Sequence, residues 1–408
     1  MKRILSLFIA AVMLLLLPAD MLASGISGVQ EEPTRVKQLD ELRESNSDTY
    51  LLSDGSYECV VYAADKYYKD DSGKYVEVDH SIVRAQSLRF GKSYAYKNAA
   101  GDASAYFADN EPRVCVEMNG SSLSFSLSGA NRTSARAGEA SAKRSVHEYE
   151  LFGKNYISYE NVLNGTDLIY EMLNGCLKEY VLLKDRSAPS ECTFIFDASE
   201  LAARKTENCT VEFINASNET VFELGALFAV DSNGEYTDAL EYTVRETGQK
   251  GRYEITVSVS KDYLNAPERA FPVLVDPSVN IYGSSLTYDS FVSNKYKDKN
   301  YYLDDYLYTG NTPRYGICRT YIKFKLPESV MGCSISDAYI RLKMQSGITP
   351  NAYLYRVTQS WSSSGVKWEN RPNYTTDKSS RFYLNTNNWY KSTVTAIVQD
   401  WVNEVYPN

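Results

Sequence analysis

The stretch AYIRLKM, residues 338–344, alternates apolar and polar side chains. Ala338, Ile340 and Leu342 fall on one side of an extended chain, whereas Arg341 and Lys343 fall on the other. An alternation with a period of two predicts a β-strand that has one face on a core and the other in water. The same pattern recurs in three further stretches: SLSFSLSG (122–129), YEITVSVS (253–260) and YIKFKL (321–326).

Composition and turn signals extend this prediction to the whole chain. The sequence holds 34 tyrosines against 14 phenylalanines, and tyrosine suits half-buried strands because its ring is apolar and its hydroxyl is polar. Asn-Gly and Asp-Gly pairs separate the apolar runs, as expected for tight turns. We therefore predict a mainly β protein made of antiparallel β-sandwich domains in tandem. One short amphipathic helix is expected within residues 394–405.

The distribution of apolar and polar residues suggests domain boundaries. Residues 1–25 have the features of an export signal that is removed, because Lys2 and Arg3 precede an apolar run at 4–17 and small residues follow. A linker is expected at 26–48, and an N-terminal β-rich region at 49–278, either whole or as two subdomains split near 130–146. A new strand system begins at 286 and continues to 408. The processed chain is expected to be secreted, without a membrane span and with a possible association to the cell wall.

Charge and motif content bear on the class of function. The chain carries a net charge of −9, but residues from 278 onward hold 15 Lys and Arg against 10 Asp and Glu. A mildly basic module favours an anionic glycan or wall polymer as partner, although a mixed solvated surface gives the same count. No basic stripe of the kind that binds nucleic acid is present, so we expect no nucleic-acid partner.

Recognisable catalytic motifs are absent from the sequence. The two histidines, His80 and His147, lie in no nucleophile setting, and no nucleotide-binding motif occurs. The seven cysteines form no zinc spacing, so neither a metal site nor a cofactor is expected, and the protein is predicted not to be an enzyme. Few disulfides are expected, with two candidate pairs: Cys192 with Cys209, and Cys318 with Cys333.

Motif residues of the C-terminal region occur in a fixed order. Trp361 is followed by V-x-W-x-N-x-P at 366–372, and V-T-x-x-V-x-x-W ends at Trp401. Together with RTYIKFKL (319–326), these blocks resemble the DNRLRE domain of bacterial extracellular proteins, with Lys325 where that family usually has Asp. The resemblance covers 286–408 and implies a β-sandwich whose pattern runs past residue 408, as an incomplete copy or a natural shortened form. It also implies packing roles for the motif residues: Trp361, Trp368, Asn370, Pro372 and Trp401.

Residues 49–279 resemble a second family. DGSYECVVYAADKYYKDDSGKYVEVD (54–79), YENVLNGTDLIYEMLNGCLKEYVLL (159–183) and FPVLVDP (271–277) are similar to the N-terminal region of wall-associated RHS, or YD-repeat, proteins of Gram-positive bacteria. In that family this region commonly precedes a DNRLRE domain. No YD repeats or toxin domain follow in this sequence, so delivery or toxin activity is not carried over.

Exposed aromatic residues are the candidates for ligand contact. Trp389 has polar neighbours, and alternation in YYLDDYLY (301–308) predicts that Tyr302 and Tyr306 are exposed. Rings of this kind stack on sugar faces, and Asp304, Asp305 and Asn311 would bond sugar hydroxyls. We therefore expect a non-catalytic protein that binds a polysaccharide or a cell-wall glycan through its C-terminal domain.

Three alternatives remain open at this point. The chain could be the leader fragment of an RHS-type polymorphic toxin or surface protein, or a polysaccharide-degrading enzyme with an acidic pair that no spacing singles out. Calcium is a possible ligand at Asp70-Asp71 or Asp304-Asp305, where a solvated turn is the simpler interpretation.

Overall fold

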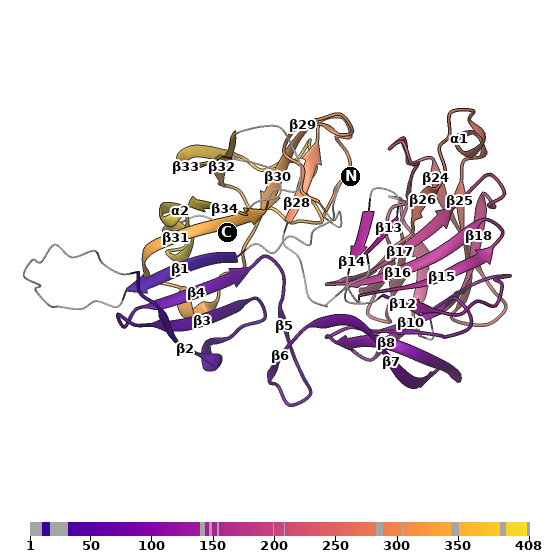
Figure 1. Ribbon diagram of the computed structural model, residues 1–408, viewed down its shortest axis with the longest axis horizontal. Coiled ribbons are helices and arrows are strands. Elements are labelled where there is room, and N and C mark those ends of the chain that lie inside the picture. The colour runs from indigo at the N-terminus through magenta and orange to yellow at the C-terminus, as the bar shows by residue number, and fades with distance from the viewer. Residues whose placement is uncertain are drawn as a thin grey trace, which may run out of the picture. The chain divides into compact units, whose positions relative to one another are not determined.

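The computed structural model describes residues 10–16, 32–138, 143–146, 149–152, 155–198, 200–207, 209–282, 289–302, 306–343, 351–383 and 389–405. The structure is mainly β, with 53% strand and 6% helix, and its strands form several antiparallel sheets (Figure 1). The predicted fold class, mainly β with a short C-terminal helix, is therefore confirmed.

Contacts between Cα atoms divide the chain into two compact units. Unit 1 is built on Glu77–Leu286, and unit 2 combines Ile4–Val76 with Thr287–Asn408. The division at 286 falls where the sequence suggested a new strand system, but residues before 77 group with the C-terminal region. The boundaries drawn from sequence, including the split near 130–146, stay a prediction.

Unit 1 contains two large sheets. The eight-stranded sheet has the order β24-β25-β18-β11-β10-β9-β8-β7, and the larger sheet has the path β12-β15-β16-β17-β27-β21-β20-β19, with β22, β23 and β26 paired beside it. The strands of the first sheet are β7 (Asp79–Arg89), β8 (Lys92–Ala100), β9 (Ser104–Phe107), β10 (Arg113–Met118), β11 (Ser121–Leu127), β18 (Glu191–Asp197), β24 (Leu240–Glu246) and β25 (Arg252–Val259). Those of the second are β12 (Arg136–Ala137), β15 (Tyr156–Leu163), β16 (Thr166–Leu173), β17 (Cys176–Leu183), β19 (Ala202–Lys205), β20 (Val211–Ile214), β21 (Thr220–Leu224), β22 (Phe228–Val230), β23 (Tyr236–Thr237), β26 (Val273–Asp276) and β27 (Val279–Ile281). A hairpin of β13 (Lys143–Val146) and β14 (Tyr149–Phe152) and a helix α1 (Lys261–Asn265) complete the unit.

One core lies between these two sheets. Phe125 of β11 and Phe196 of β18 face Tyr170 of β16 and Phe213 of β20 from the other sheet, with ring centroids 6.1 Å apart for Phe125–Tyr170 and 5.4 Å for Phe196–Phe213. All four side chains are at most 2% exposed. Alternating strands thus bury one face of each sheet against the other, as in a β-sandwich.

Unit 2 is organised around a six-stranded sheet with the order β2-β3-β4-β1-β31-β34. Its strands are β1 (Ala10–Leu16), β2 (Arg35–Gln38), β3 (Ser47–Leu52), β4 (Tyr57–Tyr62), β31 (Ser334–Lys343) and β34 (Trp389–Thr393). Smaller sheets are formed by β5 (Tyr67–Lys69) with β6 (Tyr75–Glu77), by β28 (Asp289–Ser293), β29 (Gly310–Thr312) and β30 (Gly316–Ile322), and by β32 (Asn351–Val357) with β33 (Tyr374–Tyr383). Helix α2 (Thr395–Val402) and the 3₁₀ turns η1 (Asp40–Leu42) and η2 (Glu328–Val330) complete the unit.

The core of unit 2 joins strands from both ends of the chain. Cys59 and Val61 of β4 belong to the same buried cluster as Ala338 and Ile340 of β31. Helix α2 covers this cluster with buried Ile397, Val398 and Val402. The helix predicted within 394–405 is therefore present, and its apolar stripe packs on the sheet as expected.

Three local expectations differ from the structure. Of YIKFKL (321–326), only the first two residues are in β30, because the chain leaves the sheet after Ile322 while Phe324 stays buried. The part of the expected linker that is described, residues 32–48, contains β2, η1 and the start of β3. None of the seven cysteines is disulfide-bonded; Cys192 is buried in β18, whereas its expected partner Cys209 is exposed on a turn.

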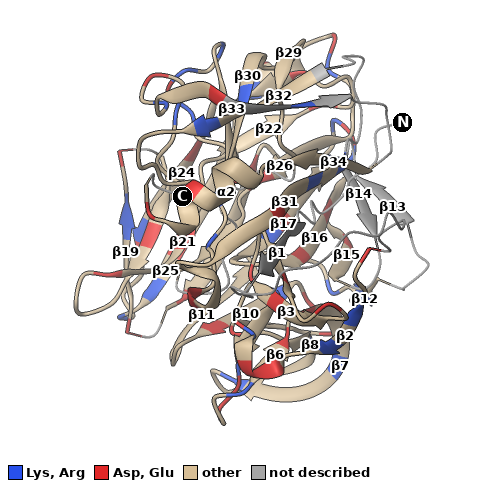
Figure 2. Cartoon of the chain, turned by 90° about the vertical axis from the view of Figure 1, so that its left-hand side faces the viewer, with Lys and Arg blue, Asp and Glu red and all other residues tan. Residues whose placement is uncertain are grey.

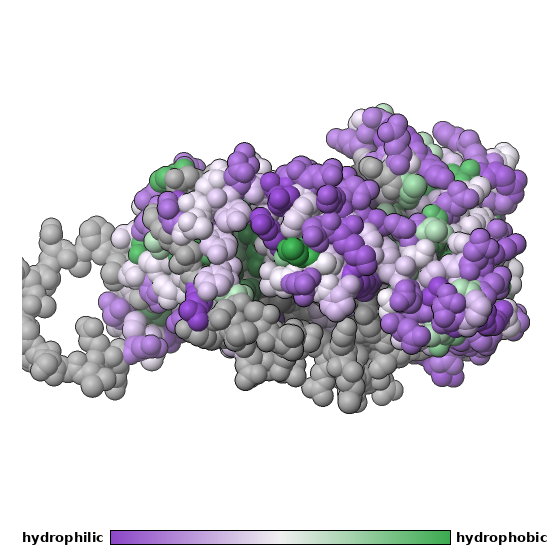
Figure 3. All heavy atoms as spheres, turned by 90° about the horizontal axis from the view of Figure 1, so that it is seen from above, coloured by the Kyte–Doolittle hydropathy of each residue, from purple (hydrophilic) through white to green (hydrophobic). Residues whose placement is uncertain are grey.

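One face of the molecule shows the distribution of polar and apolar residues on the surface. The face of the molecule seen in Figure 3 is mainly hydrophilic or near neutral, with isolated hydrophobic residues. Among the described residues, no helix combines the length and the apolar character needed to cross a membrane.

Candidate functional site

The tyrosine-rich segment after β28 folds around one phenylalanine. Phe291 is fully buried, and the ring of Tyr301 stacks on it with centroids 4.2 Å apart. Tyr308 and Tyr315 approach the same ring edge-on at 5.1 Å. Most aromatic rings here therefore stabilise one another, in the tilted and edge-on geometries that aromatic pairs prefer.

The sequence-based candidates in this segment lie at the border of that cluster. Tyr302 and Tyr306 are half-buried, and the ring of Tyr306 lies 6.3 Å from that of Tyr308. Asn311 is exposed on β29. Asp304 and Asp305 lie outside the described residues.

The tryptophan motif forms a loop that packs beside β30. The indole of Trp361 lies 5.6 Å from the ring of Tyr321, and both Trp361 and Trp368 contact a small buried cluster with Val366. The side chain of Asn370 closes the loop, because its Oδ1 accepts a hydrogen bond from the Lys367 amide at 2.6 Å and its Nδ2 donates to the Gly365 carbonyl at 2.9 Å. Pro372 is buried next to this loop.

Two further residues fix the position of this region. Asn300 donates from Nδ2 to the carbonyls of Ser363 and Val366, both at 2.6 Å, and thereby joins the tyrosine segment to the tryptophan loop. Trp401 lies half-buried on α2 and packs against the core of unit 2. Only long-range folding brings Asn300 to this loop, so no sequence signal marks it.

A row of three exposed tyrosines crosses β32 and β33. Tyr353, Tyr355 and Tyr374 have 53%, 42% and 44% of their surface exposed. The rings of Tyr353 and Tyr355 are nearly parallel with centroids 6.2 Å apart, and those of Tyr355 and Tyr374 are 5.2 Å apart. We call these three residues the tyrosine row; it offers a continuous aromatic surface to solvent.

The tyrosine row ends at a polar pocket of about 360 Å³. The guanidinium of Arg319 lies 5.4 Å from the Tyr374 ring and 5.6 Å from the Trp368 ring, so it connects the row to the tryptophan loop. The described residues that line the pocket are Arg319, Glu369, Arg371, Pro372, Asn373 and Tyr374. The pocket therefore offers two guanidinium groups as hydrogen-bond donors, and the carboxylate of Glu369 and the amide oxygen of Asn373 as acceptors.

Sequence analysis did not single out the tyrosine row, although part of its signal was visible. Tyr353 and Tyr355 are two positions apart in β32, and an extended chain places such residues on one face. The third ring joins them only through strand pairing, because Val357 of β32 pairs with Tyr374 of β33.

Trp389, a sequence-based candidate, lies on a different surface. It is 42% exposed at the start of β34, opposite Lys343 of β31. The guanidinium of Arg341 lies 5.3 Å from its ring, and the ammonium of Lys391 lies 3.4 Å from the ring of Tyr339 on the same face. Basic residues on β33 and β34 are visible in Figure 2. This outer face thus combines aromatic rings with positive charge.

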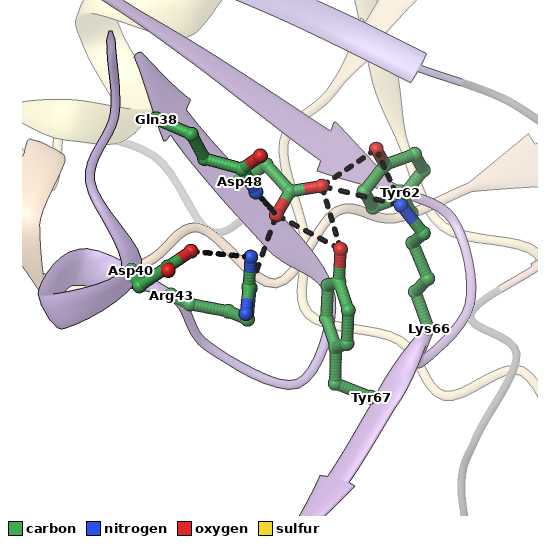
Figure 4. Close-up of polar contacts among 7 residues, drawn as sticks. All are labelled: Gln38, Asp40, Arg43, Asp48, Tyr62, Lys66 and Tyr67. Atoms are coloured by element: carbon green, nitrogen blue, oxygen red, sulfur yellow. Dashed lines mark hydrogen bonds and ion pairs between the residues drawn. The ribbon is translucent and has the colours of Figure 1, made fainter. Parts of the chain in front are cut away.

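A buried aspartate anchors the N-terminal strands of unit 2 (Figure 4). Asp48 is 1% exposed and accepts hydrogen bonds from the hydroxyls of Tyr62 and Tyr67, both at 2.9 Å. The side chains of Gln38, Arg43 and Lys66 donate to the same carboxylate at 2.8, 3.3 and 3.3 Å. We call these residues, with Asp48, the Asp48 cluster.

The electrostatics of the Asp48 cluster fit a structural role. Burial by itself raises the pKa of Asp48, but the hydrogen bonds from Tyr67 and Tyr62 and the charge of Lys66 outweigh it, so the pKa lies below its ordinary value. A carboxylate that is ionised and surrounded by donors stabilises the fold and is not poised to exchange a proton near neutral pH.

Metal and acid–base chemistry find little support among the described residues. No group of three or more His, Cys, Asp or Glu side chains there is arranged to hold a metal ion. At Asp70-Asp71, where calcium was an alternative to a solvated turn, Oδ1 of Asp70 accepts hydrogen bonds from the amides of Ser72 and Lys74 at 2.9 and 3.0 Å, which is the geometry of an Asx turn. His80 contacts Asn174 Oδ1 at 2.7 Å, and burial lowers its pKa; His147 lies outside the described residues.

Comparison with known proteins places this geometry in a class. Residues 280–406 match the profile of carbohydrate-binding module family 96, and this range contains the tyrosine row, the pocket and Trp389. The C-terminal region of the chain is therefore similar to carbohydrate-binding modules of this family.

Particular relatives resemble nearly the whole chain. The tRNA3(Ser)-specific nuclease WapA of Bacillus spizizenii is 23% identical over 98% of this chain, and the tRNA nuclease WapA of Bacillus subtilis is 22% identical over the same share. The chain spans about a fifth of the length of these relatives, 19% in each case. No solved structure matches the chain.

Proposed function

We propose that this chain is a secreted, wall-associated and non-catalytic protein that binds a polysaccharide through the tyrosine row and the Arg319 pocket. The observation that carries the proposal is three exposed rings in contact beside a polar pocket, within the region similar to carbohydrate-binding modules. Flat aromatic surfaces stack on the C–H faces of sugars, while guanidinium, carboxylate and amide groups bind hydroxyls or acidic substituents.

The mechanism of binding follows from the arrangement of these groups. Neighbouring rings in the row are 5.2 and 6.2 Å apart, so an extended chain laid along them contacts each ring in turn. Arg319 lies beside Tyr374 and is positioned to donate hydrogen bonds to the sugar bound at the end of the row. Rigid strands hold the rings, which reduces the entropy lost on binding.

Variants of the tyrosine row test the proposal by retention on insoluble wall polysaccharides and by affinity electrophoresis. Loss of one stacked ring costs about 1–2 kcal/mol, so Tyr353→Ala with Tyr355→Ala should weaken binding about 30-fold or more. Leu88→Ala is the control, because Leu88 is 65% exposed in unit 1 and lies outside residues 280–406. Equal retention of the double variant and the control on every polymer bound by the wild type would contradict the proposal.

The sequence-based candidates belong to the same proposal as a second contact area. Trp389 and Asn311 are exposed, and Trp389→Ala and Asn311→Ala are measured in the same assay. Weaker binding by Trp389→Ala alone would place the principal contact on the outer face of β31 and β34 instead of the tyrosine row.

A second candidate function is favoured by the relatives. Because the chain spans 19% of the length of proteins named as tRNA nucleases, we propose as the alternative that it forms the wall-binding leader of a longer RHS-type, DNRLRE-containing surface protein. Reading the gene past codon 408 separates the two, since YD repeats there would support the leader. Incubation of the 408-residue chain with tRNA is the companion assay, and cleavage would contradict a binding role alone.

A polysaccharide-degrading activity ranks third. The described residues that line the pocket include a single carboxylate, Glu369, whereas glycoside hydrolysis usually requires two. Release of reducing ends from a polysaccharide panel, abolished by Glu369→Gln, would restore this alternative.

A further inference from the structure

The apolar stretch near the N-terminus lies inside the sheet of unit 2. Strand β1, with the sequence AAVMLLL, pairs antiparallel with β4 from Ala10↔Tyr62 to Leu15↔Tyr57. On its other side it pairs antiparallel with β31 from Ala11↔Ile340 to Leu16↔Ser334. In the strand order, β1 alone connects β2–β3–β4 to β31–β34.

The same stretch is the apolar part of the predicted export signal. Positive charge at Lys2 and Arg3 precedes it, and small residues at 23–25 give a cleavage site. Removal of the signal therefore takes a central strand out of the sheet. It leaves a gap about 10 Å wide, since neighbouring strands are about 4.8 Å apart.

An empty gap at this position is costly for physical reasons. The edges of β4 and β31 would each lose the partner of six residues, and unpaired strand edges readily bind another extended chain. Beneath the gap lies the core of unit 2, where Cys59 and Val61 of β4 and Ala338 and Ile340 of β31 are at most 5% exposed. A segment that occupies the gap must therefore form backbone hydrogen bonds with both β4 and β31 and cover the apolar core.

Two hydrogen bonds that do not involve β1 also join the two parts of the chain that β1 connects. Nδ2 of Asn46 donates to the Lys325 carbonyl at 2.9 Å. The Glu328 amide donates to Oε1 of Glu44 at 2.8 Å. These bonds join residues before β3 to the segment that follows β30, and they remain available to both sides of the gap when β1 is absent.

We propose that the space between β4 and β31 is a strand-accepting site: once the signal is removed, it binds one extended apolar peptide of about seven residues, antiparallel to both strands. The leader occupies this site in the precursor, and its sequence and register define what the site accepts. Such β-strand addition draws affinity from main-chain hydrogen bonds and specificity from alternate side chains. The site lies apart from the tyrosine row, so it does not depend on polysaccharide binding.

Hydrogen exchange on three forms of the protein tests the proposal. The forms are residues 1–408, residues 26–408, and a precursor cut after folding at a protease site placed at 26–31. The cut form has already folded with β1 present, so its result does not depend on whether 26–408 folds by itself. The amides of β4 and β31 should exchange at least about tenfold faster in 26–408 than in 1–408. The peptide AAVMLLL with flanking lysines should restore protection and bind once per chain; on the cut precursor, the labelled peptide should displace the leader.

A peptide with proline in place of Val12 and Leu14 is the matched control, because proline lacks the amide hydrogen needed for pairing. It should neither protect β4 and β31 nor compete. Strand β17 in unit 1 should show the same protection in every form. Any one of three results overturns the proposal. The exported protein still carries residues 1–25, the amides of β4 and β31 are as protected in 26–408 without added peptide as in 1–408, or the AAVMLLL peptide leaves their exchange rates unchanged. Polysaccharide retention of the same samples reports separately on the tyrosine row.

Discussion

Replacing Asp48 by alanine should destabilise unit 2 without affecting unit 1. The carboxylate accepts hydrogen bonds from five side chains, and two donors, Lys66 and Arg43, are cations. Alanine leaves the hydroxyl of Tyr67, which is 6% exposed, without this acceptor. Removing one partner from a buried ion pair costs about 3–5 kcal/mol. Because the Lys66 and Arg43 side chains are 28% and 17% exposed and water can reach them, we expect about 3–4 kcal/mol.

Asparagine at the same position separates charge from shape. Asp48→Asn keeps one oxygen acceptor and the volume of the side chain, but it loses the charge that faces Lys66 and Arg43. We expect a destabilisation of about 1–3 kcal/mol. Asp71→Ala is the control, since Asp71 is exposed on a turn of the same unit, and it should change stability by less than about 0.5 kcal/mol.

Tryptophan fluorescence during urea unfolding measures this effect on unit 2 alone. All four tryptophans lie at 361, 368, 389 and 401, within unit 2, whereas unit 1 has none. Asp48 is more than 300 residues away from them in sequence, which follows from positions 48 and 361. Two results would refute the reasoning that residues 32–76 fold together with the C-terminal module. The first is a loss of less than about 1 kcal/mol in the free energy of unfolding measured by tryptophan fluorescence for Asp48→Ala. The second is a destabilisation seen in far-ultraviolet circular dichroism but not in tryptophan fluorescence.

Three further predictions concern single buried groups. Burial raises the pKa of Glu179 to about 8. Between its ordinary pKa and this value, the carboxyl group is protonated in the folded state and ionised in the unfolded chain. The free energy of unfolding of unit 1 should therefore fall by on the order of 1–3 kcal/mol from pH 5 to pH 8. Glu179→Gln, which still accepts from Tyr170, should remove that slope in circular-dichroism melts; an unchanged slope would contradict the assignment. Phe291→Ala should lower the stability of unit 2 by about 3–5 kcal/mol in urea titrations, because Phe291 is fully buried among tyrosines; a loss below about 1 kcal/mol would show that the cluster is not a core. The pKa of Asp48 is lowered in the folded state. The stabilisation by its carboxylate is therefore complete above the pKa of the unfolded carboxyl group and is lost as the pH falls through the pKa of the folded state. In acid, the free energy of unfolding measured by tryptophan fluorescence should fall more for the wild type than for Asp48→Asn.

The candidate site shows how far local patterns reach. Tyr353 and Tyr355 share a face because of strand periodicity, whereas Trp361, Trp368 and Asn370 were assigned to one motif through the resemblance to the DNRLRE domain. The role of the asparagine as a loop-closing residue needed coordinates, because it depends on the positions of the Gly365 carbonyl and the Lys367 amide. The Arg319 pocket was not predictable, since β30 and residues 369–374 meet only in the folded chain.

The sequence by itself determined the class of structure: alternation at 338–344 and 253–260 is local information, and it dictates strands with one buried face wherever they pair. It also indicated a binding module, because residues 286–408 resemble the DNRLRE domain and because aromatic residues such as Trp389 have polar neighbours. Only the tertiary structure decided which strands are neighbours, including the grouping of residues before 77 with those after 286. The physical reason is that backbone hydrogen bonds between strands are the same for every sequence. Pairing between strands far apart in the chain is therefore selected by how side chains such as Cys59 and Ile340 pack in one core.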